Sequence, residues 1–253
     1  MAYSNSHFGK ECADCPMAPN CISPTSIGMP ERMYLMKLMG LKRAPPTEAM
    51  LKGRDDHEAY LKDYPTLADI GEKEFKNKIK LKQSIELQEV GICSPNYGLR
   101  GYVDKFDITF DGERINVTPI ELKSGFSPKY VLQVFTYGII LSDINAKVFL
   151  QDKDGKNHAF DLYPDGNFKL NIKLILQQFK KKPQEYYFMK DDIISAKWAG
   201  HISTILSKVK TLRKYHILRF DLEETDKCFR CFGDTCSYWE HCKELNDHPH
   251  KGN

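Results

Sequence analysis

Two acids and a lysine in the middle of the chain have the types and the spacing to hold a divalent cation. Asp104 lies in the run GYVDKFD, and Glu121 and Lys123 lie two residues apart in the run INVTPIELKSG. Both runs cluster apolar and β-branched residues between turn residues, which predicts two strands joined by a turn at Asp111-Gly112. Side chains two apart on a strand point to one face, so Glu121 and Lys123 share a face that Asp104 can reach from the paired strand.

The run that follows predicts an apolar helix beside this sheet. It reads YVLQVFTYGIIL and is preceded by Ser127-Pro128, a serine that can cap the helix and a proline suited to its first position. Gln133 and Tyr137 are four residues apart, so they stack on one helical face.

Two carboxylates, a lysine, an amide and a phenol in this arrangement suit metal-assisted hydrolysis of a phosphodiester. Carboxylates hold a hard cation such as Mg²⁺ through oxygen, and the cation activates a water and neutralises charge on the phosphate. A neighbouring lysine can orient or deprotonate that water, or stabilise the transition state. The alternative is that Asp104, Glu121 and Lys123 are ordinary strand residues that form a surface ion pair.

A histidine upstream can add a nitrogen ligand to these carboxylates. Residues 46–62 predict a helix in which Gly53 and His57 lie four apart on one face. A glycine inside a helix costs about 1 kcal/mol relative to alanine, and a close approach to a neighbouring element would explain it. His57 would then face the sheet. The alternative is a surface histidine on a charged helix.

These motifs, in this order, resemble the RecB-like branch of the PD-(D/E)XK nucleases. That branch carries G-x-x-x-H, G-x-x-D, E-x-K and Q-x-x-x-Y, which stand here as Gly53–His57, Gly101–Asp104, Glu121–Lys123 and Gln133–Tyr137. The resemblance covers residues 45 to 145 by motif and is specific at the level of the superfamily. The subgroup it most resembles is the CRISPR-associated RecB-like nucleases and their viral and archaeal relatives.

The resemblance implies an α/β, restriction-endonuclease-like fold, in which helices flank a mixed β-sheet. It also implies that Lys123 activates or positions the water, and that Gln133 and Tyr137 orient the lysine or the DNA backbone. The substrate would be single-stranded DNA cleaved from an end. CRISPR adaptation proteins are the implied partners, in the trimming of prespacers for antiviral defence. The implied ligands of Mg²⁺ or Mn²⁺ are His57, Asp104, Glu121 and the carbonyl of Leu122.

Seven of the eight cysteines fall into two clusters, one near each end of the chain. Clustered thiols at these spacings can meet at one metal centre, and a zinc site and an iron–sulfur cluster fit them equally well. The resemblance favours a [4Fe–4S] cluster that clasps the two ends together, as in the iron–sulfur members. Seven thiols exceed one cluster, so Zn²⁺ at one group remains an alternative. Cys93 stands apart and is expected to be a buried thiol. The clustered cysteines are Cys12, Cys15, Cys21, Cys228, Cys231, Cys236 and Cys242.

Three regions are expected along the chain. Residues 1–45 and 220–253 would form the cysteine-rich metal region, residues 46–167 the nuclease core, and residues 168–219 a basic helical segment that contacts DNA. This last segment holds twelve basic and three acidic residues with aromatic residues between them. Basic side chains neutralise phosphates and aromatic ones stack on unpaired bases. A solvated helix face over an aromatic core is the alternative.

Composition indicates a soluble globular protein with a substantial core. Hydrophobic residues make up 41% and charged residues 28% of the 253 residues. The net charge is only +3, so any affinity for nucleic acid must come from local clusters. No apolar run is long enough to span a membrane. The sequence begins without the layout of a signal peptide, so a cytoplasmic location is expected.

Two other classes of function remain open. The chain could be a nucleic-acid-binding module with a structural zinc or iron–sulfur site and a vestigial acidic site. The intact set of Asp104, Glu121 and Lys123 argues against that class. The third class is a redox sensor, in which a cluster reports oxidation.

Overall fold

A mixed eight-stranded sheet forms the centre of the molecule in the computed structural model, which describes residues 21–41, 44–151, 157–163, 168–179, 181–217 and 238. The strand order is β5-β4-β1-β2-β3-β6-β7-β8, with β3 and β6 parallel and every other pair antiparallel. The strands are β1 Ile85–Ser94, β2 Leu99–Asp111, β3 Arg114–Lys123, β4 Lys147–Gln151, β5 Asn157–Asp161, β6 Lys169–Gln178, β7 Gln184–Lys190 and β8 Ile193–Ile194.

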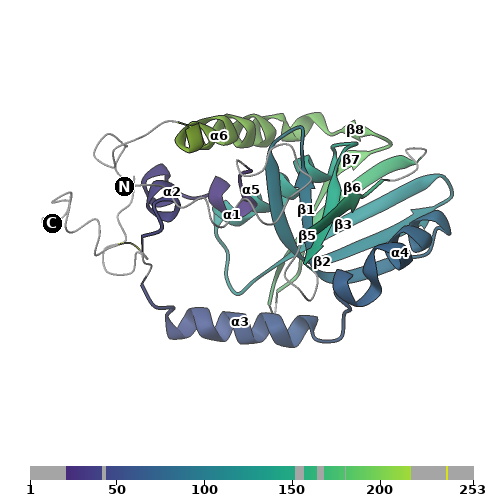
Figure 1. Ribbon diagram of the computed structural model, residues 1–253, viewed down its shortest axis with the longest axis horizontal. Coiled ribbons are helices and arrows are strands. Elements are labelled where there is room, and N and C mark those ends of the chain that lie inside the picture. Colours follow the sequence, from purple (N-terminus) through teal and green to yellow (C-terminus); the bar gives the residue numbers. More distant parts are fainter. Residues whose placement is uncertain are drawn as a thin grey trace, which may run out of the picture.

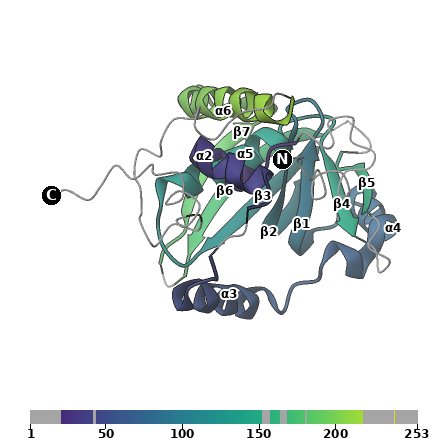
Figure 2. The same ribbon diagram turned by 60° about the vertical axis from the view of Figure 1, so that its left-hand side comes forward.

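Helices lie on both sides of this sheet (Figures 1 and 2). Helices α5 and α6 pack together on one side, and α3 runs along the other. The expected α/β fold with a mixed sheet flanked by helices is therefore confirmed. The helices are α1 Pro24–Ile27, α2 Glu31–Leu38, α3 Glu48–Leu61, α4 Leu67–Lys80, α5 Pro128–Leu141 and α6 Ala199–Ile217, with a short 3-10 turn, η1, at Ala196–Trp198.

The β2–β3 hairpin and α5 form as the sequence predicts. Asp111 pairs with Arg114 across the turn, and Gly112 adopts a φ of +59°, which a residue without a side chain reaches at little cost. Helix α5 begins at Pro128, and Ser127 occupies the capping position without a side-chain capping bond. All nine residues from 133 to 141 are buried, because this apolar helix lies directly against the sheet.

The expectation of a helical segment over residues 168–219 is wrong for its first half. Strands β6, β7 and β8 occupy residues 169–194, and the helix begins at Ala199. In β6 every second residue from Ile172 to Gln178 is buried, which is the period of a strand. The segment belongs to the same sheet as the expected core, since β6 lies between β3 and β7.

Helix α3 stands on the side of the sheet away from α5 and buries little of itself. Thr47 caps it by accepting a hydrogen bond from the backbone N–H of Met50. Leu61 is its one buried residue and packs against Ile120 and Leu122 of β3. Within the described chain, no helix is both long and apolar enough to cross a bilayer.

Candidate active site

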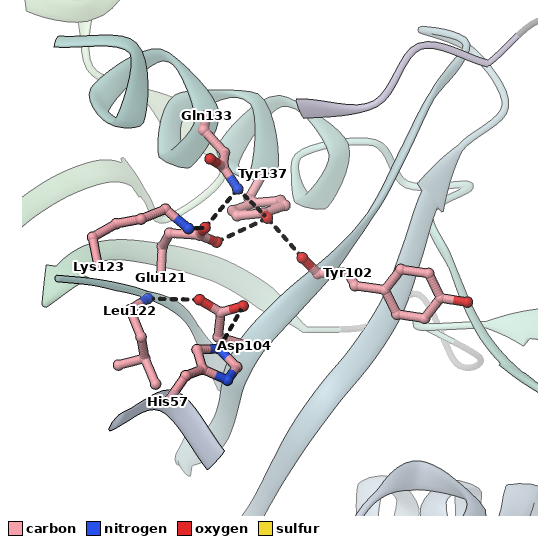
Figure 3. A network of polar contacts seen from close by, with 8 residues as sticks. All are labelled: His57, Tyr102, Asp104, Glu121, Leu122, Lys123, Gln133 and Tyr137. Atoms are coloured by element: carbon pink, nitrogen blue, oxygen red, sulfur yellow. Dashed lines mark hydrogen bonds and ion pairs between the residues drawn. The ribbon is translucent and has the colours of Figure 1, made fainter. Parts of the chain in front are cut away.

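The carboxylate of Glu121 is the centre of a hydrogen-bonded network at the end of β3 (Figure 3). Only 1% of this residue is exposed. Its Oε1 accepts a hydrogen bond from Nε2 of Gln133 at 2.6 Å and contacts the ammonium of Lys123 directly. Lys123 of the E-x-K motif and Gln133 of the Q-x-x-x-Y motif therefore meet at one carboxylate oxygen.

The phenol of Tyr137 joins three elements at this carboxylate. Its hydroxyl lies 2.9 Å from Oε2 of Glu121 and 2.6 Å from the carbonyl oxygen of Tyr102 on β2, and it accepts from Nε2 of Gln133 at 3.1 Å. Burial holds the pKa of Tyr137 well above its usual value, so the hydroxyl keeps its proton. A hydroxyl has one proton for two acceptors, and a protonated Glu121 would supply the second.

Electrostatics explain why Glu121 can hold a proton. Burial, and then the negative charge of nearby Asp104, raise its pKa to about 7, although Lys123 opposes the shift. For Lys123, burial lowers the pKa, but the carboxylates of Glu121 and Asp104 outweigh burial and raise it. The lysine is therefore a cation beside two acids in a site with little water.

Asp104 links the sheet to α3. Its Oδ2 accepts a hydrogen bond from the backbone N–H of Leu122 at 2.7 Å, and its Oδ1 lies 3.1 Å from Nε2 of His57. The hydrogen bond to Asp104 raises the pKa of His57 more than burial lowers it. Gly53 lies near Ser124, but an added Cβ would lie 3.4 Å from Oγ, which is an ordinary van der Waals distance, so this approach does not explain the glycine.

The types of donor at this end of the sheet suit a hard divalent cation, but their present arrangement does not hold one. Two carboxylates and an imidazole suit Mg²⁺ or Mn²⁺. Without a cation, each carboxylate oxygen is paired with a donor of the protein: Glu121 with Lys123, Gln133 and Tyr137, and Asp104 with His57 and Leu122. Among the described residues, no three histidine, cysteine, aspartate or glutamate side chains lie close enough together to hold one ion. To hold one cation, His57, Asp104 and Glu121 would therefore have to move closer together and give up some of these contacts.

One site residue was missed in the sequence. Gln178 lies at the end of β6, directly beside Lys123 in the parallel register, and only 4% of it is exposed. Its Oε1 is buried without a hydrogen-bond partner. The alternation of KLNIKLILQQ places Gln178 on the buried face of a strand, and that signal could have found it.

The described cysteines lie in a small apolar cluster. Cys21 and Cys93 are both buried and pack with Phe149. The expectation of a buried thiol at Cys93 is confirmed. No metal cluster or cysteine clasp appears in the part of the chain that the structure describes. The remaining clustered cysteines lie outside it: Cys12, Cys15, Cys228, Cys231, Cys236 and Cys242.

The aromatic residues of the basic segment mostly belong to the core. The ring centroid of Phe135 lies 4.8 Å from that of Trp198 and 5.3 Å from that of Tyr186. Phe188 is fully buried, so this ring belongs to the aromatic core, which is the alternative reading of the segment. Tyr187 is 66% exposed and remains open to such a role.

Comparison with known proteins gives no independent assignment. No protein-family model matches the sequence, and no curated protein matches it either. The function of this chain is therefore inferred from the chemistry of the site.

Proposed function

We propose that this chain is a metal-dependent nuclease with a restriction-endonuclease-like fold that hydrolyses DNA phosphodiesters, with single-stranded DNA cleaved from an end as its substrate. The observation that carries the proposal is the convergence of α3, β2, β3 and α5 on one buried network. Glu121 is bonded to Lys123, Gln133 and Tyr137, and the His57–Asp104 pair lies beside them. A surface ion pair would not need a buried amide and phenol to orient one carboxylate.

Each side chain has a defined role in this proposal. The cation would be Mg²⁺ or Mn²⁺, held by His57, Asp104, Glu121 and the carbonyl of Leu122. When bound, it supplies a Lewis acid that lowers the pKa of water and neutralises charge on the phosphate. Gln133 and Tyr137 fix the orientation of the Glu121 carboxylate through both of its oxygens. Lys123 would orient the attacking water or stabilise charge that develops on the phosphate.

Two further proposals concern the metal held by the clustered cysteines and the proteins with which this chain works. The clustered cysteines would hold a [4Fe–4S] cluster, with Zn²⁺ as the alternative at one group. A cytoplasmic nuclease of this kind would fit the trimming of CRISPR prespacers together with CRISPR adaptation proteins.

A second candidate is a nucleic-acid-binding module without catalysis. It is favoured by one observation: all four oxygens of the two site carboxylates already have partners within the protein. A network completed in this way could serve stability alone.

A cleavage assay separates these two candidates. Purified protein is incubated with single-stranded and duplex DNA labelled at either end, with Mg²⁺, with Mn²⁺ or with a chelator. We expect metal-dependent cleavage that Lys123→Ala abolishes while DNA binding is retained. Lys147→Ala is the matched control, because Lys147 pairs with Asp161 on β5, outside the network. Binding without cleavage under either metal would favour the binding module, and normal cleavage by Lys123→Ala would refute the role of the lysine.

A further inference from the structure

The amide of Gln178 is a buried acceptor beside the candidate catalytic lysine. Gln178 lies opposite Lys123 in the parallel β3–β6 register, so the two side chains project from the same face of the sheet. Neighbouring strands are about 4.8 Å apart, which brings an amide on one within reach of an ammonium on the other. The backbone N–H of Phe179 donates a hydrogen bond to the carbonyl oxygen of Lys123 at 3.2 Å, which joins the ends of β6 and β3.

The lack of a partner for this amide oxygen is unusual. Buried polar atoms are nearly always hydrogen-bonded, and an unsatisfied acceptor destabilises the fold. In the described chain one other buried side-chain oxygen shares this status, Oδ1 of Asp107, but the ammonium of Lys105 lies 3.2 Å from it. Oε1 of Gln178 has no hydrogen-bond partner, so the cost of burying it needs another explanation.

Lys123 needs a second acceptor if the proposed function is correct. In the structure its ammonium contacts Oε1 of Glu121, the oxygen that Gln133 also binds. A divalent cation on that carboxylate would repel the ammonium, because two positive charges cannot share one buried oxygen without a large cost. The ammonium would then leave Glu121 and require another hydrogen-bond acceptor, since it is largely removed from water.

We propose that Gln178 is a positioning residue that accepts a hydrogen bond from Lys123 when a cation occupies Glu121. This inference rests on the proposed nuclease function. The amide oxygen would hold the ammonium next to the reacting phosphate. The same oxygen is left without a partner in the metal-free protein. Without the cation, Lys123 contacts Glu121 and the amide oxygen of Gln178 has no partner. With the cation, Lys123 would donate to that oxygen.

The test uses two substitutions of nearly equal shape and one control. Gln178→Met removes the acceptor and Gln178→Glu keeps it. Asn171→Leu is the control, since this amide on the same strand donates to Asn116 and accepts from the N–H of Asp191, both at 2.8 Å. Lys123 is probed directly with an amine-acylating reagent, with and without Mg²⁺, and its modification is measured by mass spectrometry. Thermal unfolding of the metal-free proteins and DNA cleavage complete the comparison.

We expect Mg²⁺ to leave Lys123 protected in the wild type but to make it several-fold more reactive in Gln178→Met. Cleavage should fall on the order of 10- to 100-fold in that variant and largely recover in Gln178→Glu. The melting temperature of metal-free Gln178→Met should equal or exceed that of the wild type, whereas Asn171→Leu should melt lower.

Different results overturn different claims. If wild-type protein binds Mg²⁺ by calorimetry and cleaves DNA, but Gln178→Met protects Lys123 as well as the wild type does, the role of Gln178 is refuted alone. A melting temperature for Gln178→Met as low as that of Asn171→Leu would also refute it, because the amide would then be structural. If wild-type protein neither binds Mg²⁺ nor cleaves DNA, the nuclease function and this inference fail together.

Discussion

Nε2 of His57 lies 3.1 Å from Oδ1 of Asp104, and this contact ties a sparsely packed helix to the candidate site. Leu61 is the one residue of α3 that is buried. The rest of the helix is held by few contacts, among them this one and the edge-to-face contact of Tyr60 with Phe179. Any cation bound by Asp104 would alter its contact with His57, so metal binding and the placement of α3 should be coupled.

His57→Ala should loosen α3 and weaken cleavage. Removing the imidazole leaves Oδ1 of Asp104 without its partner and deletes a candidate metal ligand. We expect faster amide hydrogen exchange across Glu48–Leu61 and a loss of metal-dependent cleavage on the order of 10- to 100-fold. Arg54→Ala, on the same helix, removes only an exposed ion pair with Glu58 and should change neither quantity. Unchanged exchange in His57→Ala would show that the contact does not hold the helix.

Tyr137→Phe should destabilise the protein. It deletes the hydroxyl that lies between Glu121 and the carbonyl of Tyr102, and leaves buried acceptors unsatisfied. The expected loss is about 1–3 kcal/mol in the free energy of unfolding. Urea denaturation measures it, with exposed Tyr187→Phe as the control that should show no change. An equal stability of the two variants would mean that the hydroxyl contributes no net stabilisation.

The link between α2 and α6 should weaken in acid. Burial raises the pKa of Glu31, but hydrogen bonds from Tyr215 and Lys208 outweigh it, so the pKa in the folded protein is below its usual 4.5. Stability from this group is therefore present above pH 4.5 and is lost as the pH falls through the folded pKa. Glu31→Gln should be less stable near pH 7 by under about 1 kcal/mol, given solvent screening. Denaturation from pH 7 to 3 should show the difference shrinking; a constant difference would contradict the linkage.

Cysteine substitutions should distinguish the proposed ligands of the iron–sulfur cluster from Cys93. Anaerobically purified protein should absorb near 400 nm and contain about four irons per chain. Cys228→Ser and Cys231→Ser should lose iron, while Cys93→Ser should keep it, because Cys93 stands apart in sequence from both groups of clustered cysteines. Zinc in place of iron would remove the iron–sulfur proposal and leave the nuclease proposal intact. Loss of iron in Cys93→Ser would overturn its role as a packing residue.

Local patterns were enough to predict the elements that carry the motifs. The Asp111-Gly112 turn, the spacing of Glu121 and Lys123, and the apolar run of α5 depend on short stretches of chain, and the structure agrees with each. The network itself could be anticipated only through the resemblance. The hydrogen bond from Tyr137 to Tyr102 joins residues far apart in the sequence, and no periodic pattern of residues predicts it.

Long-range pairings account for what the sequence did not show. Tyr215 donates a hydrogen bond to Glu31, which lies 184 positions earlier, and no local sequence pattern predicts that contact. Strand β6 pairs in parallel with β3, which lies far earlier in the chain, so its place in the sheet has no local signal. The alternation of β6 indicates that Gln178 is buried, but its place beside Lys123 depends on the pairing with β3, which no local pattern shows.

The parallel pairing of β3 with β6 also has a consequence for biosynthesis. The strand that carries Glu121 and Lys123 leaves the ribosome well before Lys169–Gln178, which must cover its free edge. Until then the nascent hairpin presents unpaired backbone groups that could pair with another chain. Because Gln178 is at the very end of the covering strand, the candidate site is completed late in translation, and a fragment that stops before β6 should aggregate rather than fold.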